Sequence, residues 1–122
     1  MNIRSAKSSE ALDIATISVK AWRHAYDGIV ASATLASLDP EMKAKGWLSW
    51  YDKGTVQCLV AEEASGIVGF VDFGKDRESI EPDVGEVMAI YLDPRVIGTG
   101  VGSKLFDGAI EALIIEGYKS CV

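Results

Sequence analysis

The sequence is poor in the residues that mark secreted, metal-binding or nucleic-acid-binding proteins. Its 122 residues include only two cysteines, three prolines and one histidine. Cys58 and Cys121 are far apart and follow no metal-ligand spacing, so we expect reduced thiols, no disulfide and no metal site. With 18 acidic against 12 basic residues the formal net charge is −6, which argues against a nucleic-acid partner, because such partners call for a basic face.

Long apolar runs are also missing. No run approaches the length that crosses a bilayer, and the chain does not open with a charged segment followed by an apolar one. We therefore expect neither secretion nor membrane insertion, and predict a cytoplasmic protein. The hydrophobic content of 48% and charged content of 25% are ordinary for a globular protein, and the length predicts one domain over residues 1–122.

One stretch predicts a strand, a glycine-rich turn and a helix in direct succession. Val87–Leu92 is a short apolar run, and it stops before Pro94, which has no N–H and disfavours helical backbone in the residue before it. An apolar pattern with helical spacing begins at Val101, and Gly117 marks its expected end. Between strand and helix stand three glycines at every second position: Gly98, Gly100 and Gly102.

Such a turn is suited to binding an anion, because glycines let the backbone approach a ligand and the first N–H groups of a helix are free. A phosphate or pyrophosphate is the natural ligand, and a tight turn without a ligand is the alternative. A dinucleotide-binding Gly-x-Gly-x-x-Gly is excluded, since Ser103 or Leu105 stands at the last position. A P-loop is excluded because Ser103-Lys104 has the wrong order.

The segment Tyr91–Phe106 resembles the acyl-CoA-binding motif of the GNAT superfamily of N-acetyltransferases, whose core is Gln/Arg-x-x-Gly-x-Gly/Ala. Gly100 and Gly102 take its two small positions, whereas Ile97 stands where the family prefers Gln or Arg. Arg95 is a candidate to supply the missing charge, with a solvated side chain as the alternative. A second segment, Ala21–Ile29, is similar to the Trp-x-x-Ala-Tyr-x-Gly segment of many bacterial members.

The resemblance implies an α/β (α+β) fold with a mixed, mostly antiparallel twisted sheet flanked by helices, in the order β-α-α-β-β-β-α-β. It also implies an N-acetyltransferase that moves an acetyl group from acetyl-CoA to an amine of a small molecule or peptide, without a metal. The alternative is a catalytically inactive CoA-binding or protein-interaction module of the same fold. A structural domain whose turn binds nothing is a third hypothesis.

The resemblance assigns cofactor binding to one nearly continuous stretch. The strand residues hold the pantetheine and the carbonyl group in this family, and the turn cradles the pyrophosphate. The positions that match are Ile90, Tyr91, Leu92, Ile97, Gly98, Thr99, Gly100, Val101, Gly102 and Ser103. For Tyr91, a place in the core and a place near the thioester sulfur both stay open.

Glu86 is the candidate general base, because it stands near the position that carries the base in histone-acetylating members. A strand-end carboxylate facing solvent is the alternative. Trp22 and Tyr26 are predicted to line the acceptor pocket together with the loop 26–33, with core packing as the alternative. His24 is a further candidate, for which packing or surface exposure is the other interpretation.

The remaining elements follow from periodicity, caps and turn residues. They are a strand at about Asn2–Ser5, a helix from Ser8 or Ser9 to Gly28, a short helix over 32–38, a helix opened by Pro40 and running to about Tyr51, strands over Thr55–Ala61 and Ile67–Phe73 joined by a 62–66 hairpin, a 74–83 loop, and the beginning of a strand at Tyr118.

The family pattern continues with a helix and two strands beyond the last residue of this sequence. A cut chain, a partner subunit that completes the fold, and a degenerate remnant are the three explanations. An open strand edge beside an uncovered apolar helix face favours pairing with another chain, so we predict a homodimer.

Overall fold

The computed structural model describes residues 1–26, 39–76 and 78–121. Five strands and three helices make up this part of the chain. The strands are β1 (Asn2–Ser5), β2 (Gln57–Glu63), β3 (Gly66–Lys75), β4 (Val84–Leu92) and β5 (Ser120–Cys121); the helices are α1 (Ala11–Tyr26), α3 (Pro40–Asp52) and α4 (Val101–Ile115), with 3-10 turns at Ser8–Glu10 and Pro94–Val96.

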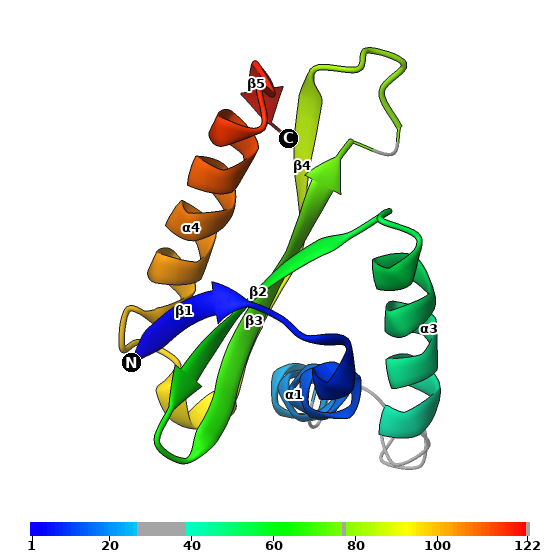
Figure 1. Cartoon of the computed structure of the whole chain (residues 1–122). Coiled ribbons are helices and arrows are strands. Elements are labelled where there is room, and N and C mark those ends of the chain that lie inside the picture. Colours follow the sequence, from blue (N-terminus) through cyan, green and yellow to red (C-terminus); the bar gives the residue numbers. More distant parts are fainter. Residues whose placement is uncertain (27–38, 77, 122) are drawn as a thin grey trace.

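The strands form one sheet in the order β1-β2-β3-β4-β5. The first three pairings are antiparallel, and only β4 and β5 run parallel. Helices cover both faces of this sheet: α4 lies along one face, and α1 and α3 lie on the other (Figure 1). The predicted fold class, a mixed and mostly antiparallel sheet flanked by helices, is confirmed.

Each face of the sheet has its own apolar core. Between the sheet and α4, buried residues include Val68, Val71, Phe73, Val101, Leu105, Ala109 and Leu113. Between the sheet and the pair α1 and α3, they include Ile14, Ile17, Trp47, Cys58, Val60 and Phe70. Tyr91 packs against the second core, whereas its neighbours Ile90 and Leu92 pack against the first.

A bulge interrupts the pairing of β3 with β4. Asp72 is paired with Ala89 but the next residue, Phe73, is paired with Val87, so Met88 is an extra residue in β4. A bulge of this kind bends a strand and changes which face its side chains occupy. It lies in the middle of the strand whose C-terminal end leads into the glycine-rich turn.

Asp39 and Pro40 begin α3 as the sequence predicts. The Asp39 side chain accepts a hydrogen bond from the Glu41 backbone N–H (2.9 Å), and Pro40 occupies the first turn. The prediction of a cap at Ser8 or Ser9 is wrong. Both serines belong to the 3-10 turn, and the backbone N–H of Lys7 donates to the Glu10 carboxylate (2.9 Å) instead.

The β2–β3 hairpin is tighter than the five-residue connection predicted. Glu63 pairs with Gly66, so the strands run up to a two-residue turn. Gly66 has a φ of 119°, a backbone conformation that other residues rarely adopt, which explains how the turn closes so sharply. The predicted helix end at Gly28 and the short helix over 32–38 lie outside the described residues.

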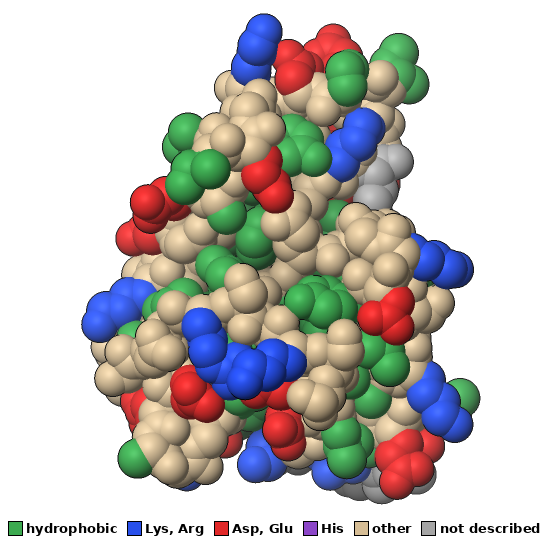
Figure 2. Space-filling model, viewed as in Figure 1, with side chains coloured by type: hydrophobic (Ala, Val, Ile, Leu, Met, Phe, Trp, Pro, Cys, Tyr) green, Lys and Arg blue, Asp and Glu red, His purple; other side chains and the backbone are tan. Residues whose placement is uncertain are grey.

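Charged side chains of both signs are interspersed on the face seen in Figure 2. Arg4 lies between Glu10 and Glu62, at 2.6 and 3.1 Å from their carboxylates. Within the described ranges, no helix combines the length and the apolar character needed to cross a membrane. Neither Cys58 nor Cys121 forms a disulfide in this chain.

Candidate functional site

The turn between β4 and α4 depends on two left-handed glycines. Asp93 caps the 3-10 turn that follows β4, accepting from the Arg95 backbone N–H (3.0 Å). Gly98 and Gly100 then have φ values of 82° and 90°. No neighbouring atom crowds either glycine, so the backbone conformation alone excludes a side chain there. The glycines at positions 98 and 100 are therefore a requirement of this turn, whereas Gly102 lies within α4.

Gly100 is also the residue from which α4 begins. The first helical hydrogen bond runs from the Lys104 N–H to the Gly100 carbonyl (3.2 Å), and the N–H groups before Lys104 have no acceptor within the helix. No acidic residue lies in the first turn of α4, and Gly98, Thr99, Gly100 and Ser103 are exposed. An incoming anion would meet free N–H groups and the positive end of the helix dipole.

The strand leading to this turn is open along most of one edge. β5 pairs with β4 only at Val84 and Gly85, so the two parallel strands touch at one end. On that side the rest of β4 has no strand beside it among the described residues. At its other end β4 is tied to β3, because the Asp93 N–H donates to the Val68 carbonyl (2.8 Å). Backbone groups of β4 near Ile90 are thus available beside the turn.

A cavity of about 290 Å³ lies against this end of β4, and we call it the β4-end cavity. It brings together residues that the sequence assigned to different roles: the acceptor candidate Trp22 and several cofactor candidates. Its lining is Ala21, Trp22, His24, Ile90, Tyr91, Leu92 and Ile97. Helix α1 supplies the first three of these residues, so α1 forms the wall opposite the strand.

Tyr91 faces α1 and α3 and packs against the core on that side of the sheet, and it also lines the β4-end cavity. Its ring packs against Phe70 with centroids 5.7 Å apart, and its hydroxyl accepts a hydrogen bond from Trp22 Nε1 (3.2 Å). The Lys43 ammonium lies 5.8 Å from the centre of the Trp22 ring. Trp22 thus interacts with Tyr91 of the sheet and with Lys43 of α3.

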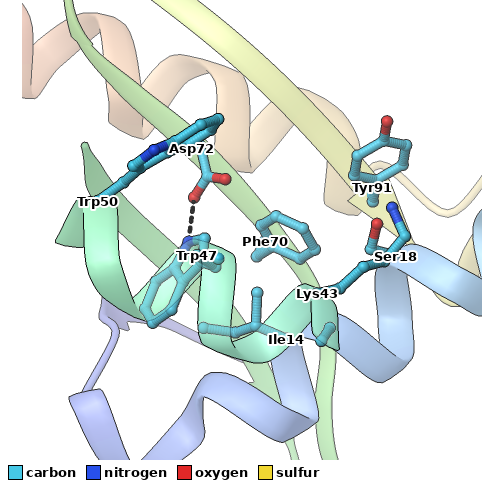
Figure 3. A pocket seen from close by; sticks show the side chains of 10 residues that line it. Ile14, Ser18, Lys43, Trp47, Trp50, Phe70, Asp72 and Tyr91 are labelled. Atoms are coloured by element: carbon cyan, nitrogen blue, oxygen red, sulfur yellow. Dashed lines mark hydrogen bonds between the residues drawn. The ribbon is translucent and has the colours of Figure 1, made fainter. Parts of the chain in front are cut away.

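On the other side of Tyr91 is a second cavity, of about 280 Å³, between α1, α3 and the sheet (Figure 3). We call it the α3 cavity. Trp47 and Trp50 of α3 enclose one end, where Asp72 projects from β3, and Tyr91 lies at the other end. Tyr91 lines both cavities and so forms part of the wall between them.

Asp72 is the functional candidate that sequence reasoning missed. Trp47 Nε1 donates to its carboxylate (3.0 Å), yet burial dominates and raises the pKa of Asp72 to about 6; the hydrogen bonds from Trp47 and the Cys58 thiol oppose that shift. Burial also raises the pKa of Cys58, with the Asp72 charge as the next cause. The available signal was a single carboxylate within a strand, Gly66–Lys75, that is apolar apart from Asp72 and its last residue.

Glu86 lies further along the same face of the sheet. It is paired with Gly74, which is two residues from Asp72 on β3, and paired residues point to the same side. Glu86 is half-buried. Its assignment as the general base stays a prediction.

Arg95 is occupied by Asp93. Its guanidinium donates from Nε to Oδ1 and from the terminal nitrogen to Oδ2, both at 3.1 Å, while Lys20 lies 3.7 Å from the same carboxylate. The Arg95 side-chain hydrogen bonds are the main cause that holds the pKa of Asp93 below its usual range, and the charge of Lys20 adds to the effect. A ligand phosphate would therefore have to compete with Asp93 for the Arg95 guanidinium that was predicted to replace the missing charge at Ile97. The group formed by Arg95, Lys20 and Asp93 nevertheless carries two positive charges and one negative charge.

The other acceptor candidates are described only in part. Tyr26 ends α1, but its side chain and the loop 27–33 lie outside the described residues. His24 is exposed and lines the β4-end cavity. Among the described residues no three His, Cys, Asp or Glu side chains are grouped as they would be around a metal ion.

Comparisons with known proteins agree with this geometry. Residues 19–122 match the model of the acetyltransferase (GNAT) family. An uncharacterised N-acetyltransferase of Bacillus subtilis, YuaI, is 32% identical over 120 residues, which cover 98% of this chain and 68% of the relative. The chain belongs to the GNAT acetyltransferase family. That membership confirms the predicted enzyme class, an acyltransferase.

Solved structures show the same fold. A PaiA N-acetyltransferase from Thermoplasma acidophilum, crystallised with coenzyme A, matches with a TM-score of 0.80 at 19% identity, over 98% of this chain and 76% of the other. A GNAT family acetyltransferase from Brucella melitensis, crystallised with acetyl-CoA, matches with a TM-score of 0.71 at 19% identity, over 98% and 72% of the two chains. At these identities the likeness establishes the fold.

Proposed function

We propose that this protein transfers the acetyl group of acetyl-CoA to an amine of a small molecule or peptide. The observation that carries the proposal is the left-handed Gly98 and Gly100 turn at the start of α4, which opens beside the unpaired edge of β4 and the β4-end cavity. Coenzyme A and acetyl-CoA are bound by proteins of the same fold.

The residues of this region suit such a ligand. Within the stretch from Ile97 to Ser103, the first turn of α4 offers backbone N–H groups and holds no acidic residue, which suits a pyrophosphate. The β4 backbone from Ile90 to Leu92 offers hydrogen-bonding groups to a pantetheine arm and a thioester carbonyl. Trp22 and Tyr91 would then lie beside the thioester, on the side from which the acceptor arrives.

Glu86 is the proposed general base. An amine attacks a thioester only when it is neutral, so a carboxylate that takes its proton, directly or through a water molecule, speeds the reaction. Replacing Glu86 by Gln keeps the size and removes the base. The expected result is a fall in kcat of about a hundredfold or more with little change in acetyl-CoA affinity. A Glu86→Gln variant with normal kcat over the pH range would remove Glu86 from the mechanism.

The direct test is a calorimetric titration with acetyl-CoA. Wild type should bind saturably, whereas Gly100→Asp, which adds a strained side chain and a negative charge to the turn, should lose binding. The matched control is Gly54→Asp, because Gly54 also has a left-handed φ (74°) and an uncrowded position, but lies in the turn after α3. Equal losses in both variants would indicate general destabilisation, and no binding by wild type would contradict the proposal.

Turnover separates the proposed enzyme from a module that only binds CoA. Release of free thiol from acetyl-CoA, followed across a panel of amines, should show a rate that depends on the acceptor. Saturable acetyl-CoA binding without acetylation of any amine or peptide would favour the binding module.

Two further predictions concern the state of the protein. We propose a homodimer, supported by Ile114 and Ile115, which are exposed near the short edge strand β5. A mass measured by light scattering tests it, and a monomer across concentrations would contradict it. A cytoplasmic location is also proposed, and fractionation of cells that express the protein tests it.

A further inference from the structure

The α3 cavity contains a carboxylate without a cation. Burial raises the pKa of Asp72, and none of the described basic side chains forms an ion pair with it. A neutral side chain could accept the single indole hydrogen bond from Trp47 equally well. A buried carboxylate is costly unless something compensates its charge, so its presence at a cavity wall points to a ligand that does.

The walls around Asp72 also suit a cation. Trp47 and Trp50 line the same end of the cavity, and Tyr91 lies at the other end (Figure 3). Aromatic faces attract ammonium groups, and they do so more strongly where water is excluded. The volume of about 280 Å³ is ample, since an apolar cavity of roughly 150 Å³ holds a benzene molecule.

Among the described residues, the one basic side chain that lines the cavity does not neutralise Asp72. Lys43 extends toward the Tyr91 end in Figure 3, and its ammonium lies 5.8 Å from the centre of the Trp22 ring. The charged ends of Lys43 and Asp72 are therefore at opposite ends of the cavity. A second positive group of modest size would be attracted to the Asp72 end and repelled from the other.

We propose that the α3 cavity is a binding subsite for an organic ammonium group of the acceptor, with the Asp72 carboxylate as counter-ion and the rings of Trp47 and Trp50 as walls. This inference rests on the proposed function, since it names the charge that the acceptor carries. Because Tyr91 lines both cavities, a molecule held here lies next to the β4-end cavity proposed for the thioester. Asp72 is a binding residue in this proposal, separate from the proton acceptor.

The probe is 2-phenylethylammonium, with uncharged 2-phenylethanol as the control of equal shape. Binding is followed by NMR through the indole N–H signals of the chain's three tryptophans, Trp22, Trp47 and Trp50. Only the ammonium compound should shift the Trp47 signal saturably, because the Trp47 indole donates to Asp72. Equal affinity for the alcohol would overturn the proposal.

Two variants test the role of charge, one by removing the negative charge from the cavity and the other by removing the positive charge. Asp72→Asn keeps an acceptor for Trp47 but removes the charge, and should weaken ammonium binding about tenfold or more. Lys43→Met removes the cation from the same cavity with little change in size, and should keep or strengthen binding. Unchanged affinity in Asp72→Asn, or an equal loss in Lys43→Met, would contradict the proposal.

A third variant guards against a folding defect in Asp72→Asn. Trp50 is 54% exposed, so Trp50→Leu should leave the fold intact and weaken ammonium binding about two- to fivefold. No weakening in Trp50→Leu would count against the aromatic wall. Acetyl-CoA titrations of the same variants should match wild type, so the ammonium subsite and the proposed acetyl-CoA site are judged on different ligands.

Discussion

Asp72 lies in β3 and Asp93 directly follows β4, and their surroundings move their pKa values in opposite directions. Asp93 accepts from the Arg95 side chain and backbone and has Lys20 nearby, and its pKa falls. Asp72 has an indole and a thiol as its partners, and burial raises its pKa to about 6. The first carboxylate binds Arg95 at the end of β4, and the second faces a cavity, where we expect its charge to lower the stability of the fold.

The sharpest contrast comes from the same substitution at both positions. Asp93→Asn should lower the free energy of unfolding by about 2 to 4 kcal/mol at neutral pH, because a 3% exposed acceptor of charged hydrogen bonds is weakened. Urea denaturation measures the change. Asp107→Asn on the exposed face of α4 is the control and should have almost no effect. An Asp93→Asn protein as stable as wild type would mean that the contact with Arg95 contributes little to the free energy of unfolding.

Asp72→Asn should act in the opposite direction. Removing a carboxylate whose charge is disfavoured by burial should raise the free energy of unfolding by roughly 1 to 2 kcal/mol at pH 8. The same urea titration measures it. A loss of stability would show that the charge itself contributes to folding, and the comparison between the two aspartates would fail.

The dependence on pH separates the two further. Asp72 holds its proton more tightly in the folded state, so wild-type stability falls as pH rises from about 4 through about 6, and the advantage of Asp72→Asn grows over that window. Asp93 has a lowered pKa, so its contribution is present above about pH 4 and is lost as pH falls through the lowered value. Thermal unfolding from pH 3 to pH 8 should give difference curves of opposite sign.

The smallest effect is expected at Lys20. Its side chain is 53% exposed and lies 3.7 Å from Asp93, so solvent screens the pair. Lys20→Met should therefore cost no more than about 0.5 kcal/mol of unfolding free energy. A larger loss in urea denaturation would show that Lys20, rather than Arg95, is the main partner of Asp93.

The strand–turn–helix unit was predictable because its determinants are local. Pro94 ends the strand, and the glycines at 98 and 100 supply the two left-handed positions within a few residues of sequence. The cavities were not predictable in the same way. Asp72 gains its surroundings from α1, α3 and β4, which lie far away in the chain, and no local pattern states how those elements pack.

The register of the hairpin also shows which features are local enough to predict from the sequence and which depend on pairing with distant residues. Turn residues at positions 62–66 predicted a connection, but only the pairing of Glu63 with Gly66 shows that two acidic residues belong to the ladder. Likewise the apolar character of β4 was visible in the sequence, whereas the extra residue at Met88 depends on how the strand pairs with β3.

Because of that extra residue, the alternation of faces along β4 shifts by one position at Met88. Before Met88, Gly85 and Val87 face α4. After Met88, Ile90 and Leu92 face α4, whereas Tyr91 faces α1 and α3. Glu86 and Tyr91 are five residues apart, which in a regular strand would put them on opposite faces, and the extra residue brings both to the face of α1 and α3. Deleting Met88 would leave them four residues apart, so a regular strand would still keep both on that face. Redesign of this enzyme could therefore straighten β4 at Met88 without exchanging the faces that Glu86 and Tyr91 occupy.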